Sequence, residues 1–276
     1  MRIVMPLFWL SLEKIDSYPF DDDRMFIAPF DVGEIPKIPL FSEQDLRHMS
    51  EEAPWALIYD SSDLKGFKSR VNILLLAFKI FSEKRYPFVK YRVCFEDHSL
   101  CARLNDTITY NYSHPRTAGR FDSDDLVRIR DGFLSLIQMD QLSMRTHNAL
   151  YFLYRAWHNP KWMDSFILMM CSLESLFSKD RPGSATAAIT TRVSSLLSSK
   201  PKCTKKDIED LYELRSRMTH GNIEASDDPG VNLGALNHLD FVTVECLRAL
   251  VQRNLYKEYS NKGSRDKLMS RLNIST

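Results

Sequence analysis

The chain has 276 residues, 44% of them apolar and 26% charged, which is enough of both to fill a sizeable core and solvate its surface, and which excludes a wholly disordered protein. Its formal net charge of +1 excludes an overall basic field, so a nucleic-acid partner would have to meet a local patch. The five cysteines are widely spaced and form no Cys-x-x-Cys pair. We therefore expect no zinc site, no disulfide framework and no cofactor.

Charge is distributed unevenly along the chain. Residues 13–63 hold 13 acidic against 4 basic side chains, whereas residues 181–221 hold 8 basic against 4 acidic ones and residues 248–271 hold 7 against 2. The basic surface is therefore expected in the C-terminal half. The apolar segment 1–12 is followed by no small-residue cleavage site, and the apolar stretch 165–177 is too short to cross a bilayer. We expect a cytoplasmic protein without a membrane partner.

The length suggests two domains, and the first, residues 1–121, is predicted to be an α+β module. Frequent prolines keep continuous helices short in this part of the chain. Enrichment in β-branched and aromatic residues predicts strands at 3–10, 55–59, 88–95 and 107–112. Apolar residues at helical spacing predict one long helix at 64–84. No motif assigns a function to this module.

The second predicted domain, residues 122–276, has few prolines, and its apolar residues recur at every third or fourth position, which indicates amphipathic helices. Ser123 is the predicted N-cap of the first helix, and two aspartates follow it. Helices are predicted at 124–139, 143–158, 161–178, 185–199, 204–220, 234–258 and 264–272. The fold class is thus predicted as an α+β N-terminal module followed by an all-α helical bundle.

The segment LYELRSRMTHG at 211–221 is the most informative part of the sequence. Thr204 is expected to cap its helix, and Gly221 is expected to end it in the left-handed conformation. Within it, Arg215 and His220 form an Arg-x-x-x-x-His motif followed by glycine. This motif resembles the signature of HEPN domains, and most closely that of the ApeA-like group. Two upstream stretches are also similar to that group: residues 165–177, which contain Glu174, and residues 190–199, which contain Arg192.

The resemblance covers roughly residues 140–256 and implies a HEPN-like helical bundle. In many members it implies metal-independent RNA cleavage, in which the motif Arg and His of two copies face each other in a homodimer. The chemistry of the two residues suits that reaction. An imidazole exchanges protons near neutral pH, and a guanidinium presents a fork of donors to phosphate oxygens. Arg215 and His220 are therefore the candidate catalytic residues, RNA is the expected partner, and no metal is expected.

Four further residues are candidates for RNA binding. Ser216 follows the motif Arg, where the most active-looking members of the family carry Asn, Asp or His, so phosphate binding is better supported than cleavage. Arg217 is a candidate secondary phosphate contact. Glu174 could orient a catalytic group, although pairing with a neighbouring cation is favoured because buried carboxylates are normally paired. The same two explanations stay open for Arg192.

Several alternatives remain beside this hypothesis. A surface histidine with two nearby arginines at a helix end can simply be solvated. The basic stretch that contains Arg265, Lys267 and Arg271 could extend an RNA surface, but a charged, solvated end is favoured. The leading alternative function is a non-catalytic HEPN-like domain that dimerises or binds a nucleotide or protein. By analogy with the family, the N-terminal module would be a sensor, or an antitoxin partner would restrain the RNase, in prokaryotic defence or stress response.

Overall fold

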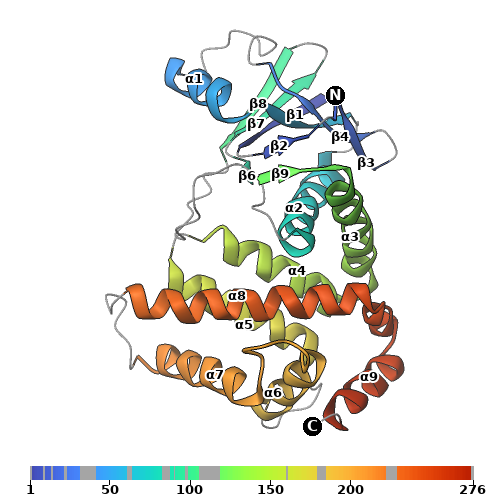
Figure 1. The fold of residues 1–276 in the computed structure, drawn as a ribbon, viewed down its shortest axis with the longest axis vertical. Helices are drawn as coiled ribbons and strands as arrows, with labels where there is room; N and C mark the ends of the chain where they lie inside the picture. The colour runs from blue at the N-terminus through green and yellow to red at the C-terminus, as the bar shows by residue number, and fades with distance from the viewer. Residues whose placement is uncertain are drawn as a thin grey trace. The chain divides into compact units, whose positions relative to one another are not determined.

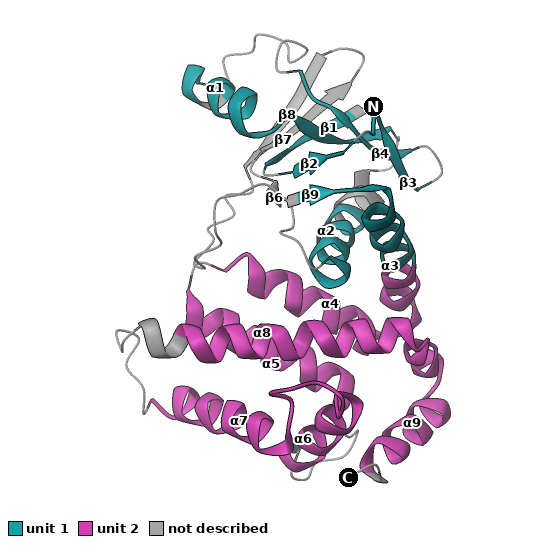
Figure 2. Ribbon diagram, viewed as in Figure 1, with its two compact units in different colours: residues 1–108, 114–134 teal, residues 109–113, 135–276 magenta. Residues whose placement is uncertain are grey.

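The computed structural model of the chain describes residues 2–8, 10–13, 15–21, 24–31, 42–60, 64–82, 88–89, 91–96, 99–105, 119–159, 161–178, 185–221 and 229–274 (Figure 1). The chain divides into two compact units (Figure 2). Unit 1 contains residues up to 108 together with 114–134, and unit 2 is built mainly from residues 135–276. The boundary near residue 134 falls inside one continuous helix, α3 (Ser123–Leu142).

Unit 1 is organised around an antiparallel β-sheet. Its strand order is β3-β4-β5-β1-β7-β8, with β6 also paired to β1. The central strand β1 pairs with β5 from Arg2↔Asp60 to Leu7↔Trp55, and it pairs with β7 on its other side. The strands are β1 (Arg2–Phe8), β3 (Tyr18–Asp21), β4 (Met25–Pro29), β5 (Trp55–Asp60), β6 (Phe88–Val89), β7 (Tyr91–Glu96) and β8 (Ser99–Asn105). A separate parallel pair is formed by β2 (Leu10–Leu12) and β9 (Gly119–Phe121).

The core of unit 1 follows from the period-two pattern of its strands and from helices α1 (Glu43–Glu52) and α2 (Leu64–Phe81). Along β1, Ile3, Met5 and Leu7 are at most 1% exposed, and Phe8 at the end of the strand is also fully buried. Four buried phenylalanine rings from β3, α2, β9 and α3 form a chain with centroids 5.5 to 6.4 Å apart: Phe20, Phe78, Phe121 and Phe133. Gly132 is required by close approach, because a Cβ there would lie 2.1 Å from the ring of Phe81.

Unit 2 is helical. Its helices after α3 are α4 (Met144–Trp157), α5 (Trp162–Phe177), α6 (Ala185–Leu196), α7 (Lys205–Thr219), α8 (Pro229–Gln252), the 3-10 helix η2 (Leu255–Ser260) and α9 (Lys262–Ile274). Helix α5 packs against α4, α6, α7 and α8, which explains why apolar residues occupy most of its circumference. Its buried side chains include Phe166, Met170, Leu173 and Phe177.

The predicted fold class is confirmed: an N-terminal antiparallel sheet with short helices precedes a mostly helical C-terminal region. The predicted helices at 64–84, 124–139, 143–158, 161–178, 185–199 and 204–220 correspond to α2 to α7. The strands predicted at 3–10, 55–59 and 88–95 correspond to β1 with the start of β2, to β5, and to β6 with β7. The strand predicted at 107–112 lies outside the described residues. Among the described helices, none combines the length and apolar character that crossing a bilayer requires.

Two local predictions are wrong. The N-cap of α3 is Asp122 rather than Ser123, because the Asp122 carboxylate accepts the Asp125 N–H at 2.9 Å while Asp125 accepts the Asp122 N–H at 3.2 Å. The helix predicted at 234–258 stops at Gln252. Asn254 then adopts a left-handed backbone (φ 54°), which asparagine tolerates, and η2 follows as a separate helix. Strands β3, β4, β8 and β9 and helix α1 were not predicted.

Candidate functional site

Helix α7 carries both residues of the predicted motif, and its N-terminal end is set by local sequence. The Thr204 hydroxyl accepts the Asp207 N–H at 3.2 Å, and the Asp207 carboxylate accepts the Thr204 N–H at 2.9 Å. This capping box confirms Thr204 as the N-cap. One face of the helix is buried in the bundle through Ile208, Leu211, Tyr212 and Met218. The opposite face lies in solvent.

The C-terminal end of α7 also forms as predicted. His220 is the C-cap, and its N–H donates to the Ser216 carbonyl at 3.0 Å. Gly221 follows with φ 72°, the left-handed conformation expected of a residue that ends a helix. The motif therefore straddles a helix terminus, with Arg215 inside the last turns and His220 at the point where the chain leaves the helix.

Arg215 is held by Glu174 of helix α5. Its Nη1 donates to Oε1 at 2.6 Å and its Nη2 donates to Oε2 at 3.4 Å, so guanidinium and carboxylate meet fork to fork. The two side chains are 30% and 26% exposed, which places the pair at the rim of the bundle. Glu174 thus has the neighbouring cation that the sequence favoured for it. The pair brings together two of the predicted site residues from segments 41 positions apart in the chain.

Two more polar side chains lie one turn earlier on the same helices, Cys171 on α5 and Tyr212 on α7. Tyr212 is 5% exposed. Within the described part of the chain, neither its hydroxyl nor the Nε of Arg215 has a hydrogen-bond partner. We call Cys171, Glu174, Tyr212 and Arg215 the α5–α7 cluster. It combines one ion pair with two buried polar atoms that have no hydrogen-bond partner among the described residues.

The electrostatics of the α5–α7 cluster are dominated by burial. Burial raises the pKa of Glu174, and the charge of Arg215 opposes that rise. Burial and then the charge of Glu174 raise the pKa of both Cys171 and Tyr212. The tyrosine hydroxyl and the thiol are therefore protonated at neutral pH, and the ionised form of Glu174 depends on its hydrogen-bond donors.

The other motif residues face solvent. Ser216, Arg217 and His220 are all exposed, and no hydrogen bond or ion pair joins the His220 imidazole to any described residue. On a regular helix, five residues correspond to about 500° of rotation and ~7.5 Å of rise, so Arg215 and His220 do not share a face. Within one chain, they are presented at the same end of α7 in different directions.

Arg192 lies elsewhere, in the interior of unit 2. It is 4% exposed, its Nε donates to Asn273 Oδ1 at 3.1 Å, and its Nη1 donates to the Phe177 carbonyl at 2.5 Å. Burial, and then the charge of Arg265, lower the pKa of Arg192. The structure therefore supports the structural explanation for Arg192, because two of its donors satisfy groups of the protein itself.

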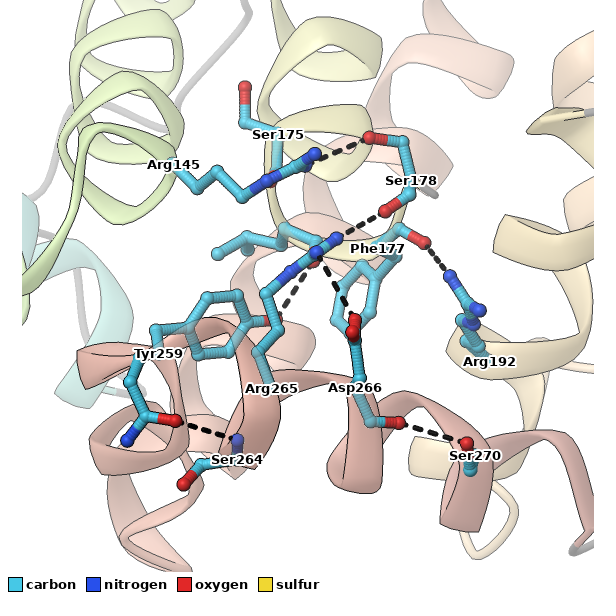
Figure 3. A network of polar contacts seen from close by, with 12 residues as sticks. Arg145, Ser175, Phe177, Ser178, Arg192, Tyr259, Ser264, Arg265, Asp266 and Ser270 are labelled. Atoms are coloured by element: carbon cyan, nitrogen blue, oxygen red, sulfur yellow. Dashed lines mark hydrogen bonds and ion pairs between the residues drawn. The ribbon is translucent and has the colours of Figure 1, made fainter. Parts of the chain in front are cut away.

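Arg192 belongs to a larger network around the C-terminal turn of α5 (Figure 3). Each of the four carbonyls from Ser175 to Ser178 accepts a hydrogen bond from a side chain of another element. Arg145 of α4 donates to Ser175 O at 3.0 Å and Tyr259 of η2 donates to Leu176 O at 2.9 Å. Arg192 of α6 donates to Phe177 O, and Arg265 of α9 donates to Ser178 O. Cations at a helix C-terminus also complement its dipole.

Sequence reasoning missed this network. Arg265 was assigned to a solvated basic end, but it is 4% exposed, so that assignment is wrong for this residue, whereas Arg271 of the same stretch is exposed. The available signal was weak: a run of unpaired helix carbonyls needs donors, but which arginines reach them depends on packing between α4, α5, α6 and α9.

Other candidate sites are limited. In the described residues, no group of three or more His, Cys, Asp or Glu side chains is placed to hold a metal ion. An open pocket of about 600 Å³ is lined by Glu258, Asp266, Lys267, Ser270 and Arg271, and it contains none of the six candidate catalytic and RNA-binding residues. The α5–α7 cluster with the exposed end of α7 is therefore the best candidate site.

No protein-family model, curated protein or solved structure matches the chain.

Proposed function

We propose that unit 2 is a HEPN-like RNA-binding domain that acts as a metal-independent endoribonuclease, with Arg215 and His220 as its functional pair. The observation that carries this proposal is the state of Arg215. Its guanidinium is oriented by Glu174 at the rim of the bundle, 30% exposed, and the exposed imidazole of His220 is presented at the end of the same helix.

Arg215 would bind the phosphate. A guanidinium in a fixed orientation stabilises the negative charge that accumulates on the phosphoryl oxygens during transfer, and Glu174 limits the rotamers it samples. Because Glu174 acts through Arg215, it is a positioning residue in this proposal. Ser216 and Arg217 are exposed next to Arg215 in the chain and would add secondary contacts to the RNA backbone.

His220 would move the proton. An imidazole takes a proton from a ribose 2′-hydroxyl or gives one to the leaving oxygen near neutral pH. Since Arg215 and His220 do not share a face of α7, one chain supplies only part of the catalytic arrangement. We therefore infer a homodimer in which the ends of two α7 helices meet across a two-fold axis.

A cellular role in prokaryotic defence or stress response follows from the same family analogy, with a cytoplasmic location. Unit 1, or a separate antitoxin, would then restrain the RNase until a signal arrives.

The test is an RNA cleavage assay with purified protein and mixed-sequence RNA in the presence of EDTA. The expected result is cleavage by the wild type, and a loss of about 100-fold or more in Arg215→Ala and in His220→Ala. Arg155→Ala, an exposed arginine on α4, and His147→Ala, an exposed histidine bonded to Asp140, are the matched controls and should retain activity. Activity that EDTA abolishes, or that survives in both motif variants, contradicts the mechanism.

One observation favours the alternative of a non-catalytic domain that dimerises or binds a nucleotide or protein. Both terminal nitrogens of Arg215 already donate to Glu174, and its Nε is buried. In that case the pair is a structural contact. Arg215→Ala would then lower the stability of the fold and affect no RNA cleavage. The wild type itself would show no cleavage under the conditions above.

A further inference from the structure

Tyr212 of unit 2 carries a buried hydroxyl that the proposed function leaves unexplained. Its ring contributes to the buried face of α7, but in the described residues its hydroxyl makes no hydrogen bond although it is shielded from water. A buried hydroxyl without a partner costs about 1–3 kcal/mol, so a phenylalanine would stabilise this position at least as well. The hydroxyl calls for a reason other than the stability of this conformation.

The surroundings of the hydroxyl supply one. Tyr212 lies three residues before Arg215, so the two side chains are neighbours on α7. Helices α5 and α7 pack against each other, and Arg215 pairs with Glu174 at 2.6 Å, so this ion pair lies one helical turn from Tyr212. The charges of Glu174 and Arg215 also act on the pKa of the tyrosine hydroxyl. Glu174 has no other hydrogen-bond donor than Arg215 among the described residues.

The ion pair poses a problem for RNA binding. If the Arg215 guanidinium turns to a phosphate, the Glu174 carboxylate, only 26% exposed, loses the fork of donors that stabilises its charge. Leaving a partly buried carboxylate without a donor is unfavourable, and this penalty opposes RNA binding unless another donor replaces Arg215. The protonated, unpartnered hydroxyl of Tyr212 is a neutral O–H donor that would fill this role.

We propose that Tyr212 is a positioning residue. When Arg215 binds an RNA phosphate, the Tyr212 hydroxyl replaces it as the hydrogen-bond donor to the Glu174 carboxylate. The inference rests on the proposed function, since it concerns how the same arginine becomes available to substrate. With this exchange of donors, the Glu174 carboxylate accepts at least one hydrogen bond both in the free protein and in the RNA complex. The exchange also explains why, among the described residues, the Tyr212 hydroxyl has no partner in the protein free of RNA.

The experiment is Tyr212→Phe, which removes one oxygen atom. The full chain is titrated against a fluorescein-labelled single-stranded RNA of mixed sequence, in EDTA, and the dissociation constant is read from fluorescence anisotropy. A hydrogen bond to a charged group implies about tenfold weaker binding in the variant. Its melting temperature should equal that of the wild type or exceed it, because a buried polar atom without a partner is removed.

The matched control is Tyr256→Phe. Tyr256 is equally buried in unit 2, but its hydroxyl already donates to Gln138 at 2.8 Å. This variant should melt at a lower temperature and bind RNA like the wild type. A second control is Tyr212→Phe in a Glu174→Gln background, where no carboxylate charge remains to be compensated. There the loss of the hydroxyl should change RNA affinity less than twofold.

The outcomes separate the two proposals. If the wild type binds RNA and Arg215→Ala does not, but Tyr212→Phe binds like the wild type, the exchange is wrong and the proposed function stands. The same holds if the tenfold loss persists in the Glu174→Gln background, because Tyr212 then acts without the carboxylate. If the wild type and Arg215→Ala bind RNA equally, or neither binds, the proposed function fails and the exchange fails with it.

Discussion

Arginine side chains have different roles at two sites of unit 2. At the C-terminal turn of α5, the buried Arg192 and Arg265 donate to main-chain carbonyls, and all four carbonyls from Ser175 to Ser178 have a donor. At the α5–α7 cluster, Arg215 is 30% exposed and donates to another side chain, and a buried hydroxyl beside it has no partner in the described residues. The first site has the properties of a structural cap, and the second retains groups that a ligand could engage.

Substitution of Arg192 is the strongest way to break this comparison. Arg192→Ala should lower the free energy of unfolding by about 3 kcal/mol, because it leaves the Phe177 carbonyl and the Asn273 side chain without their donor and removes a buried side chain. Chemical denaturation followed by circular dichroism measures the loss. Arg155→Ala, on the exposed face of α4, should change stability by less than about 0.5 kcal/mol. A loss below about 1 kcal/mol for Arg192→Ala would show that its guanidinium is not part of a structural cap.

A smaller effect is expected from Tyr259, which sharpens the contrast with Tyr212. Tyr259→Phe removes the donor to the Leu176 carbonyl, so the free energy of unfolding should fall by about 1–2 kcal/mol. Tyr212→Phe removes a hydroxyl that bonds nothing in the described residues and should not lower stability. Parallel urea titrations of the two variants measure the difference. Equal losses would mean that the two buried hydroxyls are equivalent, contrary to the contrast drawn between the sites.

The smallest expected effect is a pH dependence confined to the α5–α7 cluster. Because burial raises the pKa of Glu174 above its usual value, the folded protein binds this proton at a higher pH than the unfolded chain does. The contribution of Glu174 to stability is therefore lowest above its folded pKa and rises as pH falls through that pKa toward the ordinary glutamate value. This direction is opposite to that of a carboxylate whose pKa is lowered by its ion pair.

The measurement is the melting temperature of the wild type and of Glu174→Gln from pH 7 down to the ordinary range of glutamate. As pH falls through the raised pKa of Glu174, the melting temperature of the wild type should rise relative to that of the variant. A wild type that instead loses stability relative to Glu174→Gln over this interval would mean that Arg215 outweighs burial at this site. Arg192→Ala should leave the difference unchanged, since its acceptors carry no ionisable group.

The parts of the fold and the site that the sequence predicts are those set by local interactions. Thr204 and Gly221 were identified because a cap and a left-handed terminus depend on residues within one turn. The predicted helix 234–258 was too long at its C-terminal end. In the sequence, Asn254 resembles an ordinary residue on a helix surface, and only the structure shows its left-handed backbone. The short strands β3, β4 and β9 were not predicted, because an alternation of apolar and polar residues is hard to recognise over three to five residues.

The candidate site divides in the same way. The spacing of Arg215 and His220 is visible in the sequence, but the partner of Arg215 lies 41 residues away on another helix. Arg192 and Arg265 show the opposite case, because nothing within one turn of either residue reveals that it is buried against the end of α5. A charged residue in an amphipathic segment is normally solvated, and only the packing of helices reverses that expectation.

Helix α3 contributes to two cores. Its first three turns place Gly132 against Phe81 and Phe133 against Phe20 in unit 1, while further along Gln138 accepts the hydroxyl of Tyr256 in unit 2. Cutting the gene before residue 123 would consequently remove Phe133, which packs on Phe20, from the core of the amino-terminal product, whatever the carboxy-terminal product retained. Recombination that exchanges one half for a new one would have to carry this shared segment along, so the two halves are expected to be inherited, and to change, together.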